Sequence, residues 1–151
     1  MQLFVDLDGV LADFDTYYDT LFGGRPDKKD DSVDWKAIAK ADKFFFNLPP
    51  MPDYEALWAR VERHSPIILT GIPSSVPNAP DLKRAWVSKY IGPSVPVITC
   101  ASKNKYSYAS PGDVLIDDWE KYKVKWENVG GIWITHVNAV ETAKRLTEIG
   151  L

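Results

Sequence analysis

The sequence contains little cysteine and little histidine, and each shortage excludes a class of protein. Cys100 is the only cysteine among the 151 residues, so an internal disulfide framework is ruled out and a reducing compartment is favoured. The two histidines, His64 and His136, each stand without a second histidine or a cysteine at metal-ligand spacing. This pattern argues against a zinc site.

Long apolar runs and an excess of one charge are missing as well. No run approaches the roughly 20 apolar residues that cross a membrane, and the N-terminus shows no signal-peptide pattern, so we expect a soluble, cytoplasmic protein. The net charge is −3, with both signs mixed. This charge gives no support for binding a long nucleic acid, but it is compatible with binding a single nucleotide. We therefore expect neither a membrane nor a long nucleic acid as partner, and the composition leaves a homodimer open.

Aromatic and other hydrophobic residues, in contrast, are plentiful. Hydrophobic residues make up 45% of the chain, which includes six Trp, seven Tyr and six Phe. A chain of this length and composition is expected to form one domain, residues 1–151, with a substantial core. Some of the rings are expected to line a pocket, because aromatic faces stack on planar ligands.

Strand-like and helix-like segments alternate along the chain. Apolar strands are expected at 3–6, 66–69, 95–99, 114–116 and 131–135. Helices are expected at 13–22, 35–41, 54–64, 81–91 and 120–128, and from Asn138 onward. The alternation predicts an α/β fold, a three-layer Rossmann-like parallel sheet of about five strands with helices on both faces.

One part of the chain interrupts this alternation. Residues from about 16 to 50 hold short helical segments, a polar and charged stretch at 25–34, and a proline-rich exit that continues to residue 52. The insertion is too short for a full second domain. We therefore expect a small helical cap, inserted after the first strand and lying over the crevice of the sheet.

Acidic, hydroxyl and lysine side chains follow four of the predicted strands. They are Asp6 and Asp8 after the first, Thr70 after the second, Lys103 and Lys105 after the third, and Asp117 and Asp118 after the fourth. Parallel strands end at one edge of the sheet, so these groups are expected to converge there. One carboxylate can carry a phosphoryl group and a second can move protons, while a hydroxyl and an ammonium hold phosphoryl oxygens and clustered carboxylates suit Mg²⁺. For the first pair alone, the plain alternative is a solvated acidic turn.

In kind and order this set resembles the haloacid-dehalogenase superfamily of aspartyl phosphatases. The resemblance rests on the Asp-x-Asp at 6–8, on Thr70, on a lysine after the third strand and on the acidic pair at 117–118. It implies that Asp6 is the nucleophile, that Asp8 is the general acid and base, and that Thr70 binds the phosphoryl group.

The same resemblance implies a magnesium ion and a phosphate-binding lysine. The implied ligands of the magnesium ion are Asp6, the main-chain carbonyl of Asp8, Asp117 and, as a further or indirect ligand, Asp118. Lys103 and Lys105 both lie near the position of the phosphate-binding lysine, and neither matches it closely. Lys105 is favoured because an asparagine-lysine pair stands where relatives have an acidic residue followed by lysine; the alternative for either is a solvated surface lysine.

A narrower resemblance is to the 5'(3')-deoxyribonucleotidases. It rests on the segments 6–14, 44–52, 85–92, 115–118 and 134–138. It implies that Phe14, Phe44 and Phe45 stack on a nucleobase, with plain packing inside the cap as the alternative for each. Gly71 and Lys103 are expected at the rim that binds the substrate phosphate.

The chain also departs from those relatives. Gly71 stands where they carry serine, Trp119 stands where they carry arginine, and the cap is short. These changes touch the phosphate rim and the base pocket. They bear on the identity of the substrate more than on the reaction.

The favoured hypothesis is a magnesium-dependent phosphomonoesterase that dephosphorylates (deoxy)nucleoside monophosphates through an aspartyl-phosphate intermediate. One alternative keeps the chemistry and changes the substrate to another small phosphometabolite. The other is a non-catalytic, phospho-accepting signalling domain. Receiver domains of that kind carry their acidic pair after the first strand, whereas here the pair follows the fourth.

Overall fold

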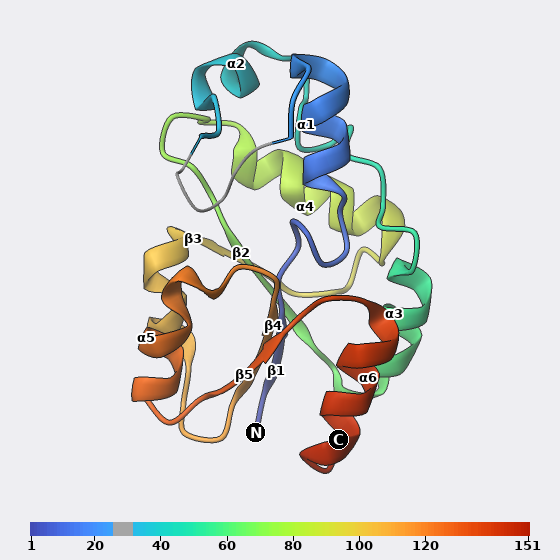
Figure 1. The fold of residues 1–151 in the computed structure, drawn as a ribbon, viewed down its shortest axis with the longest axis vertical. Coiled ribbons are helices and arrows are strands. Elements are labelled where there is room, and N and C mark those ends of the chain that lie inside the picture. The colour runs from blue at the N-terminus through green and yellow to red at the C-terminus, as the bar shows by residue number, and fades with distance from the viewer. Residues whose placement is uncertain (26–31) are drawn as a thin grey trace.

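A parallel sheet of five strands forms the centre of the computed structural model, which describes residues 1–25 and 32–151 (Figure 1). The strands are β1 (Leu3–Val5), β2 (Ile67–Gly71), β3 (Val97–Cys100), β4 (Val114–Asp117) and β5 (Ile132–Thr135). They lie in the order β3-β2-β1-β4-β5, and every neighbouring pair is parallel. The predicted α/β class and the five-stranded parallel sheet are confirmed.

β1 is apolar along its whole length, and β2 and β4 are apolar up to their carboxyl ends, because both faces of the sheet are covered. All three residues of β1 are buried. Their side chains alternate between the two faces, so that Leu3 and Val5 belong to a large core while Phe4 belongs to a smaller one with Trp126 and Trp133. Two cores, one on each face, explain why the strands read as continuous hydrophobic runs.

Helices cover both faces. The α-helices are α1 (Phe14–Phe22), α2 (Trp35–Lys40), α3 (Tyr54–Val61), α4 (Ala79–Tyr90), α5 (Lys123–Asn128) and α6 (Ala139–Glu148). Short 3-10 helices are η1 (Glu62–His64), η2 (Ser102–Tyr108) and η3 (Glu120–Tyr122). In Figure 1, α5 lies on one side of the sheet, and α3 and α6, which contact each other, lie on the other. Within the described ranges, no helix combines the length and the apolar character needed to cross a membrane.

Side chains cap the first turns of two helices, and α4 begins earlier than predicted. The side chains of Asp34 and Asn138 accept hydrogen bonds from the backbone N–H groups three residues on, at 3.0 and 2.9 Å, and so begin α2 and α6. α4 begins at Ala79, two residues before the predicted start, because Pro80 fits the first turn of a helix, where its missing N–H is not needed. Two predicted helices each contain a 3-10 turn, η1 after α3 and η3 before α5.

The insertion between β1 and α3 lies above the carboxyl ends of the strands (Figure 1). Its buried side chains include Phe14, Tyr18, Ile38, Phe44, Phe45 and Leu48. The indole Nε1 of Trp86, in α4, donates to the carbonyl of Leu48 at 2.8 Å and joins the end of the insertion to the rest of the protein. Residues 26–31, which include most of the predicted polar loop, lie outside the described residues.

Candidate active site

Two strand ends bring the first acidic groups together. Asp6 follows β1 directly, and its N–H donates to the carbonyl of Ile116 at 2.9 Å, so the pairing of β1 with β4 continues as far as Asp6. Asp117 is the last residue of β4, and both aspartates are buried. The two carboxylates therefore lie side by side at the edge where open α/β sheets bind ligands.

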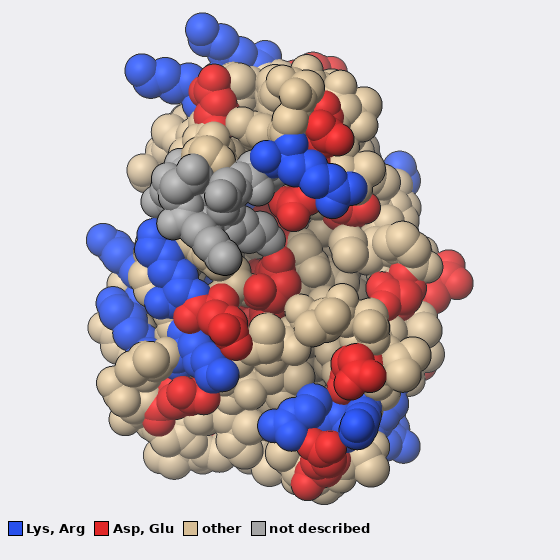
Figure 2. All heavy atoms as spheres, in the orientation of Figure 1, with Lys and Arg blue, Asp and Glu red and all other residues tan. Residues whose placement is uncertain are grey.

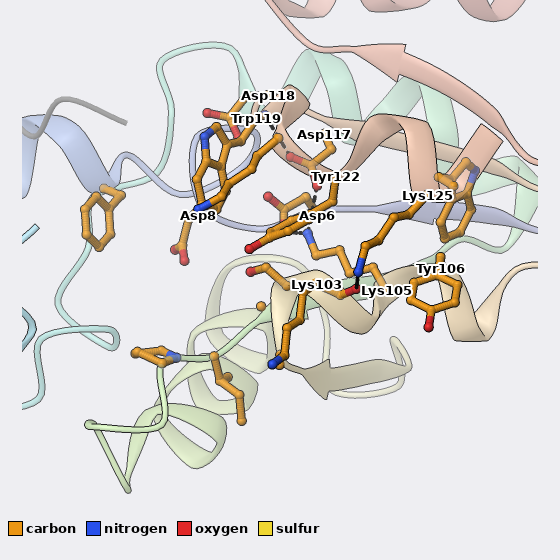
Figure 3. Close-up of a pocket in the computed structure, with 18 of the residues that line it drawn as sticks. Asp6, Asp8, Lys103, Lys105, Tyr106, Asp117, Asp118, Trp119, Tyr122 and Lys125 are labelled. Atoms are coloured by element: carbon orange, nitrogen blue, oxygen red, sulfur yellow. Dashed lines mark hydrogen bonds and ion pairs between the residues drawn. The ribbon is translucent and has the colours of Figure 1, made fainter. Parts of the chain in front are cut away.

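Lys105 lies between these two carboxylates (Figure 3). It belongs to η2, which follows β3, and its Nζ is 2.9 Å from Asp6 Oδ1 and 2.8 Å from Asp117 Oδ2. Burial by itself lowers the pKa of Lys105, but the charges of Asp6 and Asp117 outweigh burial and raise that pKa, so the ammonium stays charged. Lys103, the other lysine considered, is exposed and lines the cavity described below. Of the two, Lys105 is the lysine that reaches the acidic groups.

Asp117 is an acidic group with an altered proton affinity. Burial, and then the charge of Asp6, raise the pKa of Asp117 to about 7, although Lys105 acts in the opposite direction. Its second oxygen, Oδ1, accepts a hydrogen bond from the N–H of Trp119 at 2.9 Å. In the absence of a bound cation, Asp117 therefore changes its charge near neutral pH.

Three carboxylates form a cluster that can hold a cation. One oxygen from each of Asp6, Asp117 and Asp118 lies within 4.8 Å of the others, and among the described residues the Asp8 side chain is not part of this group. The turn after β1 passes close to Asp118, since a Cβ on Gly9 would lie 2.1 Å from Asp118 Oδ2 and Gly9 has a φ of +79°. Oxygen donors grouped in this way fit Mg²⁺, which takes carboxylates and waters.

A further lysine, Lys83 in α4, contacts three of the predicted site residues, although the sequence pattern did not single it out. Lys83 is 1% exposed, and its Nζ lies 2.6 Å from Asp8 Oδ2, 3.1 Å from Thr70 Oγ1 and 2.6 Å from the carbonyl oxygen of Gly71. The position of Lys83 among the apolar residues of α4 was the sequence feature that could have identified it. Lys83 stands four residues after one buried apolar position of α4 and three residues before another, on the helix face that packs inward.

Thr70 and Gly71 end β2 beside this lysine. Thr70 is completely buried and is not among the residues that line the cavity, so its described contact with the other predicted groups runs through Lys83. Gly71 does line the cavity, and a Cβ there would lie 1.9 Å from Ser102 Oγ. The serine that the relatives carry at this position would require the Ser102 side chain to move, whereas glycine lets β2 pass close to Ser102.

A cavity of about 310 Å³ lies over the acidic groups. Its wall on the insertion side contains Phe14, Val33, Trp35 and Phe45. Its opposite wall contains Lys103, Tyr106, Trp119, Lys121, Tyr122 and Lys125 (Figure 3). Figure 2 shows acidic side chains in the hollow between the upper and lower parts of the molecule. A cavity of this size is at the small end of the range for small-molecule sites, and its aromatic walls suit a planar ring.

Among the three phenylalanines expected at the cavity, Phe14 and Phe45 line it and Phe44 does not. Phe44 is 1% exposed, and its ring packs against the rings of Phe14 and Phe45, with centroids 5.5 and 5.2 Å apart. Packing inside the insertion is therefore what the structure shows for Phe44. Trp35 of α2 supplies a lining ring that the sequence pattern did not distinguish from other aromatics of the insertion.

Replacing Lys105 by methionine is expected to destabilise the protein. The change leaves Asp6 and Asp117 buried side by side without their cation, and breaking a buried ion pair in this way costs about 3–5 kcal/mol. Urea unfolding in metal-free buffer should show this loss well above the pKa of Asp117 and a smaller loss well below it, where protonation removes one of the two charges. Lys103→Met, at an exposed position of η2, should change the unfolding free energy by no more than about 0.5 kcal/mol. Equal losses in both variants would contradict the prediction.

Comparison with known proteins identifies solved structures with a similar fold. No protein-family model matches the chain, and the search of curated proteins returns no match. Among solved structures, it is similar to L-2-haloacid dehalogenase from Xanthobacter autotrophicus with chloropropionic acid covalently bound, at 14% identity and a TM-score of 0.56, over 97% of this chain and 82% of that one. A second structure of the Xanthobacter autotrophicus enzyme matches at 14% identity and a TM-score of 0.56, over 99% of this chain and 83% of that one. The chain therefore has the fold of the L-2-haloacid dehalogenases.

Proposed function

We propose that this protein is a hydrolase that removes phosphate from small phosphomonoesters, with nucleoside monophosphates as the preferred class, through an aspartyl-phosphate on Asp6. The observation that carries the proposal is the position of Lys105 between Asp6 and Asp117 beneath the cavity. The buried ammonium of Lys105 offsets part of the negative charge of Asp6 and Asp117. A substrate phosphate can therefore approach Asp6, the anionic nucleophile, with less repulsion.

The proposed reaction has two steps. In the first, the Asp6 oxygen that Lys105 does not bind attacks phosphorus, the bond from phosphorus to the ester oxygen breaks, and Asp8 gives its proton to the departing oxygen. In the second, Asp8 takes a proton from water, the water oxygen attacks phosphorus, and the bond from Asp6 to phosphorus breaks. Phosphate is released, and both aspartates return to their starting states.

The carboxylates of Asp6, Asp117 and Asp118 would hold a magnesium ion. When bound, the ion would offset the repulsion between the phosphate and the carboxylates. The protein's own contribution is to hold these oxygens close together, through the end of β4 and the tight turn at Gly9.

Magnesium affinity is expected to rise with pH up to about 7. Burial raises the pKa of Asp117 to about 7, so below that pH a proton competes with the metal for Asp117, and affinity should fall by up to about tenfold for each further pH unit. Isothermal calorimetry of Mg²⁺ binding at several pH values would measure the trend. Asp117→Asn should weaken binding and flatten the trend. An affinity that does not change across this range would contradict the prediction.

The fold likeness raises a second candidate, displacement of a halide by Asp6. A chloride ion leaves without a proton, whereas an alkoxide needs one. Asp8 stands two residues after Asp6 and also lines the cavity, which favours an ester substrate over a haloacid.

The aromatic walls support a nucleotide rather than a sugar phosphate. Phe14 and Trp35 on one side and Trp119 and Tyr122 on the other line the cavity that holds the acidic groups. Stacking of a base on such rings is worth about 1–3 kcal/mol.

A release assay tests the proposal. Phosphate release is measured across nucleoside monophosphates and common sugar phosphates, and chloride release from 2-chloropropionate, each with Mg²⁺ and with a chelator. Continuous, magnesium-dependent phosphate release that is fastest with nucleotides is expected. Faster release from sugar phosphates would still support the proposed reaction but would contradict the proposed substrate class. Self-labelling that stops after one turnover would indicate a signalling domain, and chloride release alone would indicate a dehalogenase.

A further inference from the structure

We propose that Lys83 is a positioning residue, which ties the Asp8 carboxylate to the end of β2 and so aims its free oxygen at the ester oxygen of the substrate. The inference rests on the function proposed above, because it assigns a purpose to Lys83 in the proton-transfer step. Lys83 is among the residues that line the cavity, but its ammonium is expected to touch Asp8 and not the reacting atoms.

The buried ammonium of Lys83 uses all of its hydrogen-bond donors. A lysine ammonium has three N–H donors and no acceptor. The Nζ of Lys83 has three acceptors within 3.1 Å, which are Asp8 Oδ2, Thr70 Oγ1 and the carbonyl oxygen of Gly71. With every donor used and 1% of the residue exposed, the ammonium has one orientation available to it. Its position is therefore a fixed reference point for Asp8.

Asp8 lies beyond the end of its strand, whereas the other partners of Lys83 lie within one. β1 ends at Val5, and Asp8 lies in the turn that follows, where strand pairing no longer sets the direction of a side chain. Thr70 and Gly71, in contrast, belong to β2 and are paired with β3. Lys83 joins the two, so the rigid strand end determines where the carboxylate of the turn lies.

The two carboxylate oxygens of Asp8 have different surroundings. Oδ2 is bound by Lys83 at 2.6 Å. Oδ1 is buried and has no hydrogen-bond partner among the described residues, although Asp8 as a whole lines the cavity. A buried carboxylate oxygen without a donor is unfavourable unless something else binds it. Holding one oxygen leaves the other available to carry the proton.

Aromatic side chains support the position of Lys83. Its Nζ lies 4.6 Å from the centre of the Phe45 ring, which also lines the cavity. One turn further along α4, Trp86 is bonded to the carbonyl of Leu48. The lysine is thus held between the helix and the end of the insertion, so that a cavity wall and the proton donor are fixed by the same contacts.

The test compares two esters that differ in their need for a proton. A nucleoside monophosphate releases an alkoxide, which needs one, whereas 4-nitrophenyl phosphate releases a stabilised anion, which does not. In Lys83→Met we expect kcat/KM for the nucleotide to fall by about 10²-fold, with KM changed by less than about threefold, and kcat/KM for the nitrophenyl ester to fall by less than about tenfold. Lys89→Met, at an exposed lysine of the same helix, should match the wild type on both esters.

A double-mutant cycle adds a second measurement. If Lys83 acts through Asp8, then Lys83→Met should cause little further loss of kcat/KM for the nucleotide in an Asp8→Asn background. Equal losses on both esters, a full further loss in that background, or failure of both Lys83→Met and Lys83→Gln to fold by circular dichroism would each overturn the proposal and make Lys83 structural. Turnover of the wild type decides the proposed function separately. A wild type that releases phosphate from neither ester would refute that function, whatever the variants do.

Discussion

Asp6→Asn is expected to abolish phosphate release and to leave no phosphorylated protein. An amide oxygen is a poor nucleophile, and loss of a nucleophile lowers kcat by roughly 10⁴–10⁶-fold. The fold should survive, since asparagine has nearly the same shape and its carbonyl oxygen can still accept the hydrogen bond from Lys105. The measurements are phosphate release with Mg²⁺ and mass spectrometry of the acid-quenched protein for a phosphoryl group on the peptide that contains residue 6.

Asp13→Asn is the matched control for this prediction. Asp13 lies in the same N-terminal stretch and caps α1 by accepting a hydrogen bond from the N–H of Thr16 at 3.2 Å. Asparagine caps equally well, and Asp13 does not line the cavity, so activity should be unchanged. Full magnesium-dependent activity in Asp6→Asn would refute the mechanism, because no other described acid is assigned the attack on phosphorus.

Asp8→Asn is expected to slow turnover by about 10²–10⁴-fold without preventing phosphorylation by a good leaving group. With 4-nitrophenyl phosphate the first step needs no proton, so nitrophenolate should appear in a rapid burst equal to the amount of protein. The second step needs Asp8 to activate water, so the aspartyl-phosphate should then accumulate and decay slowly. Rapid-quench kinetics and the same mass-spectrometric assay measure both phases.

The two variants are expected to differ in both the burst and the phosphoprotein, and this difference distinguishes the roles of Asp6 and Asp8. Asp6→Asn should show neither burst nor phosphoprotein, whereas Asp8→Asn should show both. A wild type that already stops after one turnover would instead support the signalling domain, since such a domain keeps its phosphoryl group. Rapid steady turnover in Asp8→Asn would contradict the assignment of Asp8 as acid and base.

Local features of the fold were predictable because short-range chemistry sets them. The apolar run 3–5 and its counterpart at 114–116 are strands since both sheet faces are covered. Asp34 and Asn138 cap helices through bonds to residues three positions away. The start of α4 was predicted two residues late, at residue 81, because Pro80 usually ends regular structure but also suits the first turn of a helix.

Contacts between distant segments were harder to predict. Lys103 and Lys105 are equivalent by composition, and only the path of η2 after β3 buries Lys105 against Asp6 and leaves Lys103 exposed. Phe44 and Phe45 are adjacent in the chain, yet one lies inside the insertion and the other lines the cavity. Side-chain direction in such an irregular segment depends on what packs around it, and no periodic pattern reveals that.

The sequence by itself determined the sheet, its covering helices and the edge at which Asp6, Thr70 and Asp117 converge, because hydrophobic periodicity and the parallel arrangement of strands settle these features. Only the tertiary structure decided which cations serve that edge. Lys83 lies 75 positions from Asp8 along the chain and Lys105 lies 99 positions from Asp6. Pairs so far apart meet only when a helix or a loop has packed onto the sheet, and their meeting turns a row of acidic strand ends into a defined site.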